Sequence, residues 1–150
     1  MMLSSLLTFI VFTITTGVIL GVFAFCQCVH YPLYKKIKEG FSSYEEEFQK
    51  MMICFVTPLI IIDVFSNVIL AVRFGGASYG VFIALALMFN IMTWLVTFFF
   101  QIEYHKKLLL GFSSKNMSCM IKANWVAMTL WIAKTASLCA YMVLIHTSVM

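Results

Sequence analysis

The sequence has very little charge. Only 11% of its 150 residues are charged and only six are acidic, whereas about a quarter of an ordinary soluble domain is charged. Hydrophobic residues make up 63% of the chain, and the mean hydropathy is +1.00. This composition excludes an ordinary soluble globular domain and predicts a membrane protein.

The common motifs of catalysis are also missing. The chain has no CxxC, no glycine-rich phosphate loop and no nucleophile beside a recognisable base. An odd count of five cysteines, mostly in apolar surroundings, favours buried thiols that pack as small hydrophobes. A redox pair of Cys26 and Cys28 is the alternative, although a two-residue spacing turns side chains to different faces of a helix. The five are Cys26, Cys28, Cys54, Cys119 and Cys139.

Four apolar segments are long enough to cross a bilayer, which requires about 20 residues of helix. We expect helices over about 6–31, 43–73, 79–105 and 115–146, in one domain that occupies 1–150. No Lys or Arg precedes the first segment and no small-residue cleavage site follows it, so we expect a retained helix rather than a signal peptide. The predicted fold is all-α, an antiparallel four-helix transmembrane bundle.

Basic residues are concentrated in two of the three connections. Lysines occur throughout 35–50 and 106–122, the middle connection carries only Arg73, and the tails carry no Lys or Arg. The positive-inside rule predicts that both lysine-rich loops are cytoplasmic and both termini lie outside. The expected partners are the bilayer, its anionic head groups, and a second copy or another membrane protein. Nucleic acid is not expected, because the basic residues are few and adjoin the membrane.

The two lysine-rich loops share a sequence. "YKKIKEGFSS" at 34–43 and "HKKLLLGFSS" at 105–114 are 71 positions apart. The match predicts two parallel helical-hairpin repeats around an axis along the membrane normal, and chance similarity of short basic loops is the alternative. We expect left-handed glycines at Gly40 and Gly111, and a capping box in which Ser42 or Ser43 pairs with Glu45 or Glu46.

Two opposite charges lie deep in the apolar segments. Asp63 and Lys134 are also 71 positions apart, so the repeat would place them at equal depth. Charged groups inside a bilayer are unfavourable unless they are paired, and we therefore predict an ion pair. Its role is either to fix helix register or to relay protons or ions.

Uncharged polar residues form stripes near the predicted cytoplasmic ends of the helices. Stripes of this kind are typical of hydrogen bonds between helices. The alternative is a polar ligand pocket in which His30 and His105 approach one another across a shared cavity. The candidate pocket residues are Gln27, His30, Tyr31, Trp94, Gln101, His105 and Asn124.

The two histidines do not indicate a metal site. A metal or haem would require further ligands, and no carboxylate or thiol stands at a recognisable spacing from His30 or His105. We therefore predict no metal site and no cofactor.

Three stretches resemble a family of small uncharacterised bacterial four-helix membrane proteins. They are "QCVHYPLY", "MTWLVTFFFQIEYHKKLLLGF" and "NWVAMTLWIAK". Phe48 and Ala127 depart from the family pattern, which has a His and an Arg at these positions. The matching positions are Gln27, His30, Tyr31, Pro32, Leu33, Thr93, Trp94, Gln101, His105, Asn124, Trp125, Trp131 and Lys134.

The resemblance implies a location in a bacterial inner membrane. The four-helix plan is more distantly similar to the anthrone-oxygenase-like membrane family, which implies oxidation of an aromatic substrate without a cofactor. The leading hypothesis is a membrane protein without catalytic activity, which is either a small-ligand binder or a subunit of a larger assembly. The alternative is a small membrane oxidoreductase that uses the polar pocket near the cytoplasmic face.

Overall fold

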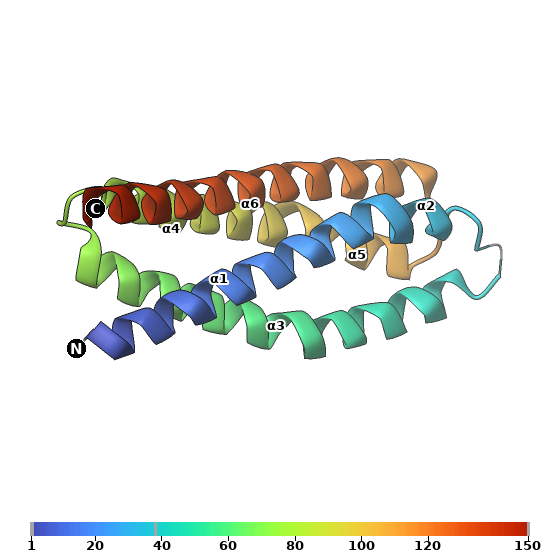
Figure 1. Cartoon of the computed structure of the whole chain (residues 1–150). Coiled ribbons are helices and arrows are strands. Elements are labelled where there is room, and N and C mark those ends of the chain that lie inside the picture. The colour runs from blue at the N-terminus through green and yellow to red at the C-terminus, as the bar shows by residue number, and fades with distance from the viewer. Residues whose placement is uncertain (1, 38, 150) are drawn as a thin grey trace.

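The computed structural model describes residues 2–37 and 39–149. The described residues form four long helical segments, and each is long and apolar enough to cross a membrane (Figure 1). Two of these segments contain a short π-helical turn. In chain order the elements are α1 (Met2–Phe25), η1 (Cys26–His30), α2 (Tyr31–Tyr34), α3 (Phe41–Phe74), α4 (Val81–Val96), η2 (Thr97–Gln101), α5 (Ile102–Leu109) and α6 (Ser114–Val149).

The segments are arranged as two hairpins. α1 packs mainly on α3 and α4 packs mainly on α6, so the first hairpin is 2–74 and the second is 81–149. Figure 1 shows both termini and the 75–80 connection at one end of the molecule. The opposite end, here called the basic end, holds residues 35–37 and 39–40 and the 110–113 connection, with Lys35, Lys36, Lys106, Lys107 and Lys115 in or beside them. The predicted all-α antiparallel four-helix bundle is confirmed.

The outer surface of the bundle is apolar. Large hydrophobic side chains such as Phe65 and Val72 are 66% and 82% exposed, and each span is at most 28% buried over its most apolar window. A soluble protein rarely exposes so large a continuous apolar surface, whereas lipid tails solvate it well. The chain therefore has the architecture of an integral membrane protein.

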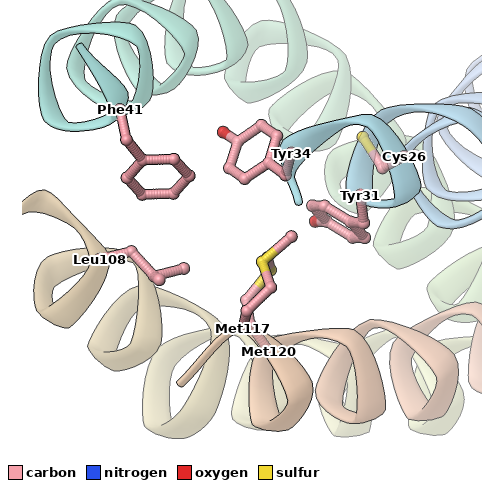
Figure 2. Close-up of a cluster of buried hydrophobic side chains, with 7 residues drawn as sticks. All are labelled: Cys26, Tyr31, Tyr34, Phe41, Leu108, Met117 and Met120. Carbon is pink, nitrogen blue, oxygen red and sulfur yellow. The ribbon is translucent and has the colours of Figure 1, made fainter. Parts of the chain in front are cut away.

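Buried apolar side chains gather in two clusters. One lies near the termini and includes Phe12, Ile83 and Tyr141. The other lies at the basic end, where side chains from η1, α2, α3, α5 and α6 converge (Figure 2). The members drawn there are Cys26, Tyr31, Tyr34, Phe41, Leu108, Met117 and Met120.

The two similar loops differ in part from what the sequence predicts. Gly40 and Gly111 have φ angles of 68° and 133°, so the predicted left-handed glycines are confirmed. The predicted capping box is wrong: α3 begins at Phe41, directly after Gly40, and has no side-chain cap. Glu45 instead turns into the protein and is fully buried.

The two π-helical turns occupy equivalent positions in the two hairpins. η1 begins at Cys26 and η2 at Thr97, which are 71 positions apart, as are the glycines of the two loops. In each turn the carbonyl of the first residue accepts the N–H of the fifth residue beyond it. π-helical turns are rare and occur often at functional sites. The offset of 71 residues between the two turns is structural support for the two-repeat hypothesis, in addition to the similarity of the loop sequences.

Candidate functional site

Buried polar side chains form three layers between the hairpins. The central layer surrounds Asp63, the amide layer surrounds Asn124, and the basic-end cluster surrounds Glu45. Each layer contains hydrogen bonds from one hairpin to the other. Together they run from the middle of the bundle to the basic end.

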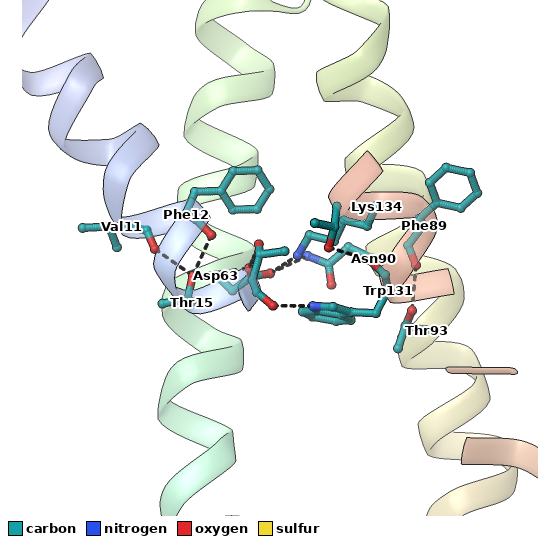
Figure 3. A network of polar contacts seen from close by, with 11 residues as sticks. Val11, Phe12, Thr15, Asp63, Phe89, Asn90, Thr93, Trp131 and Lys134 are labelled. Atoms are coloured by element: carbon teal, nitrogen blue, oxygen red, sulfur yellow. Dashed lines mark hydrogen bonds and ion pairs between the residues drawn. The ribbon is translucent and has the colours of Figure 1, made fainter. Parts of the chain in front are cut away.

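The central layer contains the predicted ion pair. The Lys134 ammonium contacts the Asp63 carboxylate directly, and both side chains have no exposed surface (Figure 3). Asn90 donates a hydrogen bond of 3.0 Å to Oδ2 of Asp63, and Thr16 and Thr15 donate bonds of 2.7 and 3.3 Å to Oδ1. All four segments therefore contribute to one buried carboxylate.

Aromatic rings complete the surroundings of the ammonium. Nζ of Lys134 lies 4.0 Å from the centre of the Trp131 ring and 4.9 Å from that of Phe12, which are distances for cation–π attraction. The Trp131 indole donates a 2.8 Å hydrogen bond to the backbone carbonyl of Thr16 on the other hairpin. A buried charge pair is favourable only when its remaining polar atoms also find partners. Here both carboxylate oxygens are hydrogen-bonded and the ammonium faces two rings, whereas Oδ1 of Asn90 is buried without a partner among the described residues.

The amide layer joins the two π-helical turns to α6. The Asn124 amide donates to Oε1 of Gln27 at 2.7 Å, and Gln101 donates to Oδ1 of Asn124 at 3.4 Å. Thr97 donates to Oε1 of Gln101 at 2.8 Å. Three predicted pocket residues, from η1, η2 and α6, are thus brought together by direct hydrogen bonds.

The basic-end cluster is built around Glu45, a residue that the sequence analysis did not place in the site. Its carboxylate accepts hydrogen bonds from the Tyr34 hydroxyl at 2.5 Å and from the Gln49 amide at 2.8 Å. Nδ1 of His105 lies 2.5 Å from Oε1. Because an ionised carboxylate only accepts hydrogen bonds, we assign the proton of this contact to Nδ1.

His30 lies beside this carboxylate cluster among aromatic rings. Its ring centre is 3.9 Å from that of Phe48 and 4.3 Å from that of Tyr34. The imidazole is 7% exposed, and Nε2 is a buried atom without a hydrogen-bond partner among the described residues. Buried polar atoms are nearly always satisfied, so Nε2 marks a position where a bound group would gain a hydrogen bond.

Packed aromatic rings, rather than the predicted open cavity, lie between His30 and His105. Phe48 stacks on His30 and its ring centre lies 6.4 Å from that of His105, so the two histidines share an aromatic neighbour rather than a space. The open hollows of about 420 and 730 Å³ on the described surface have other lining residues.

The remaining pocket candidates are placed differently. Tyr31 is buried and packs among the apolar side chains at the basic end that Figure 2 shows. Trp94 is half-buried and packs on Phe98, one turn along the same segment, without a polar contact to the other candidates. Among residues 2–37 and 39–149, no three His, Cys, Asp or Glu side chains are grouped to hold a metal ion.

No family model, curated protein or solved structure matches this chain. The resemblances to the small bacterial membrane family and to anthrone oxygenases therefore stay predictions from the motifs.

We predict that the central ion pair behaves as a coupled unit. Asp63→Leu or Lys134→Met alone should reduce stability in detergent by about 3 to 5 kcal/mol, because each leaves one buried charge unpaired. The double variant should recover most of that loss, since apolar replacement of a whole buried pair is often close to neutral. A double-mutant cycle on thermal unfolding measures this coupling. Additive losses would show that the two residues act independently.

Proposed function

We propose that this chain is an integral protein of a bacterial inner membrane that binds a small ligand at the basic-end cluster and does not catalyse a reaction. The basic end faces the cytoplasm, and both termini lie outside. The charge distribution supports this orientation, because lysines flank the basic end while only Arg73 lies at the other end of the spans.

The observation that carries the proposal is the unsatisfied Nε2 of His30. Nδ2 and Oδ1 of Asn67 and Oδ1 of Asn90 are also buried without a hydrogen-bond partner among the described residues. Of these side chains, only that of His30 belongs to the basic-end cluster, where it stacks on aromatic rings beside a carboxylate that accepts three hydrogen bonds. The cluster is rigidly supported, since Glu45 bonds to both neighbouring segments through Tyr34 and His105. A polar group that is held in place and has no hydrogen-bond partner within the protein is typical of a binding site.

The surroundings indicate the class of ligand. Tyr34, Tyr44 and Phe48 present their rings to His30, with centres 4.3, 5.9 and 3.9 Å away. A small uncharged aromatic molecule with a hydroxyl or carbonyl group would stack on these rings and hydrogen-bond to Nε2. It would enter by displacing the half-buried ring of Phe48, which now occupies the stacking position.

A membrane oxidoreductase is the second candidate, and one observation favours it. Tyr34, Glu45 and His105 form a continuous hydrogen-bonded chain with two links of 2.5 Å. Such a chain can pass a proton to or from a bound substrate. A purified protein that oxidises an added aromatic alcohol to a carbonyl compound while it reduces dissolved dioxygen to hydrogen peroxide, with loss of activity in Glu45→Gln, would favour this function over simple binding.

We predict the orientation of the spans by cysteine labelling. With the five native cysteines replaced, Ser78→Cys in the 75–80 connection should react with an impermeant thiol reagent outside whole cells. Ser43→Cys at the basic end should react only after lysis, although both positions are exposed. The reverse pattern would overturn the charge-based orientation.

We predict that native mass spectrometry of the detergent-extracted protein detects a small noncovalent adduct. His30→Gln should lose it, because glutamine cannot reproduce both the ring stacking and the position of Nε2. His146→Gln, a change at the exposed histidine near the C-terminus, should retain it. Absence of an adduct from the unaltered protein, or an equal adduct in His30→Gln, would contradict ligand binding here. A retained protein partner instead would favour a subunit of an assembly.

A further inference from the structure

A groove runs along the outer surface between the α4–α5 segment and α6. It measures about 420 Å³ and is separate from the three polar layers. Residues four apart line it on one side, and a stripe with helical spacing lines it on α6. The lining residues are Val96, Phe100, Tyr104, Cys119, Lys122, Ala123 and Val126.

One end of the groove is positively charged. Lys122 is exposed and forms none of the ion pairs found among the described residues. Nζ of Lys107 lies 5.2 Å from the centre of the Tyr104 ring at the same end. The nearby Glu103 pairs with Lys106 at 2.8 Å and also attracts Lys107, so Lys106, Lys107, Lys122 and Glu103 together leave a net positive charge at this end. A negative group at this end of the groove would therefore meet two lysines.

The depth of this end matches that of lipid head groups. Lys122 precedes Lys134 by 12 residues on α6, which is about 18 Å of helix at 1.5 Å per residue. The hydrocarbon half-thickness of a bilayer is about 15 Å. Arg73 lies 10 residues, or about 15 Å, beyond Asp63 in the opposite direction, which is consistent with an ion pair at the bilayer centre. Val126, about 12 Å from that centre, is at acyl-chain depth.

We propose that this groove binds an anionic phospholipid. Its phosphate lies between Lys122 and Lys107, and the first part of one acyl chain follows the apolar stretch past Ala123 and Val126. Lysines at the surface attract anionic lipids by about 1 kcal/mol each. The groove adds apolar contacts with the acyl chain to this electrostatic attraction. A zwitterionic lipid would fill the same groove, but the cation of its head group would lie near the lysines and be repelled by them. Its binding should therefore be weaker.

The test measures lipid retained by the full chain in native mass spectrometry, with phosphatidylglycerol or phosphatidylcholine added to the detergent. We expect preferential retention of phosphatidylglycerol. The variant Lys107→Gln/Lys122→Gln should reduce that retention by about 30-fold, which corresponds to about 1 kcal/mol for each of the two lysines. The control Lys35→Gln/Lys115→Gln removes the same charge from exposed positions outside the groove and should retain it.

A second pair of variants tests the shape of the groove without a change in charge. Val126→Trp fills the groove and should reduce retention, whereas Ile132→Trp, at an equally exposed position of α6 outside the groove, should not. Unchanged elution and unfolding temperature establish that each variant is folded. Equal losses in the two lysine variants, equal retention of the two lipids, or displacement of lipid by millimolar inorganic phosphate would overturn the proposal.

Discussion

The contact between Asp63 and Lys134 is the interaction on which the arrangement of this bundle depends. Lipid tails are as apolar as the outer helix faces, so no hydrophobic force drives the two hairpins together within the membrane. A buried carboxylate that binds α1, α4 and α6 provides a specific attraction instead. Because either charge alone would be strongly unfavourable in hydrocarbon, the pair also selects one register of the hairpins.

The position of this pair explains how the similar hairpins fit together. Residues at equivalent positions of two repeats can touch only if they lie near the axis that relates the repeats. Asp63 and Lys134 share the 71-residue offset of the π-helical turns and of the two loops, and they touch. If the hairpins are repeats, the axis that relates them passes close to the ion pair. Away from the ion pair the two hairpins carry different residues at equivalent positions. His30 corresponds to Gln101 and Tyr34 corresponds to His105, so the basic-end cluster is a single asymmetric site.

Sequence reasoning predicts the parts of the structure that depend on composition and on long-range spacing. Hydropathy gives the four spans, and the 71-residue offset gives the Asp63–Lys134 contact. The sequence does not predict the burial of Glu45. A glutamate that follows two serines fits a helix cap locally, whereas tertiary packing turns this side chain inward. The spacing of Phe41, Glu45, Phe48 and Met52 already places Glu45 on an apolar helix face. Trp94 is misplaced because a stripe drawn with ordinary α-helical periodicity does not allow for the extra residue that η2 introduces.

The most direct test of the central claim asks whether the ion pair holds the hairpins together. A protease site placed in the exposed stretch 75–79 allows the folded, detergent-extracted chain to be cut between Asp63 and Lys134. The account predicts that the two halves of the unaltered protein co-elute after cleavage and that Asp63→Leu separates them. The double variant Asp63→Leu/Lys134→Met should restore co-elution. Halves that stay together in Asp63→Leu as firmly as in the unaltered protein would contradict the account.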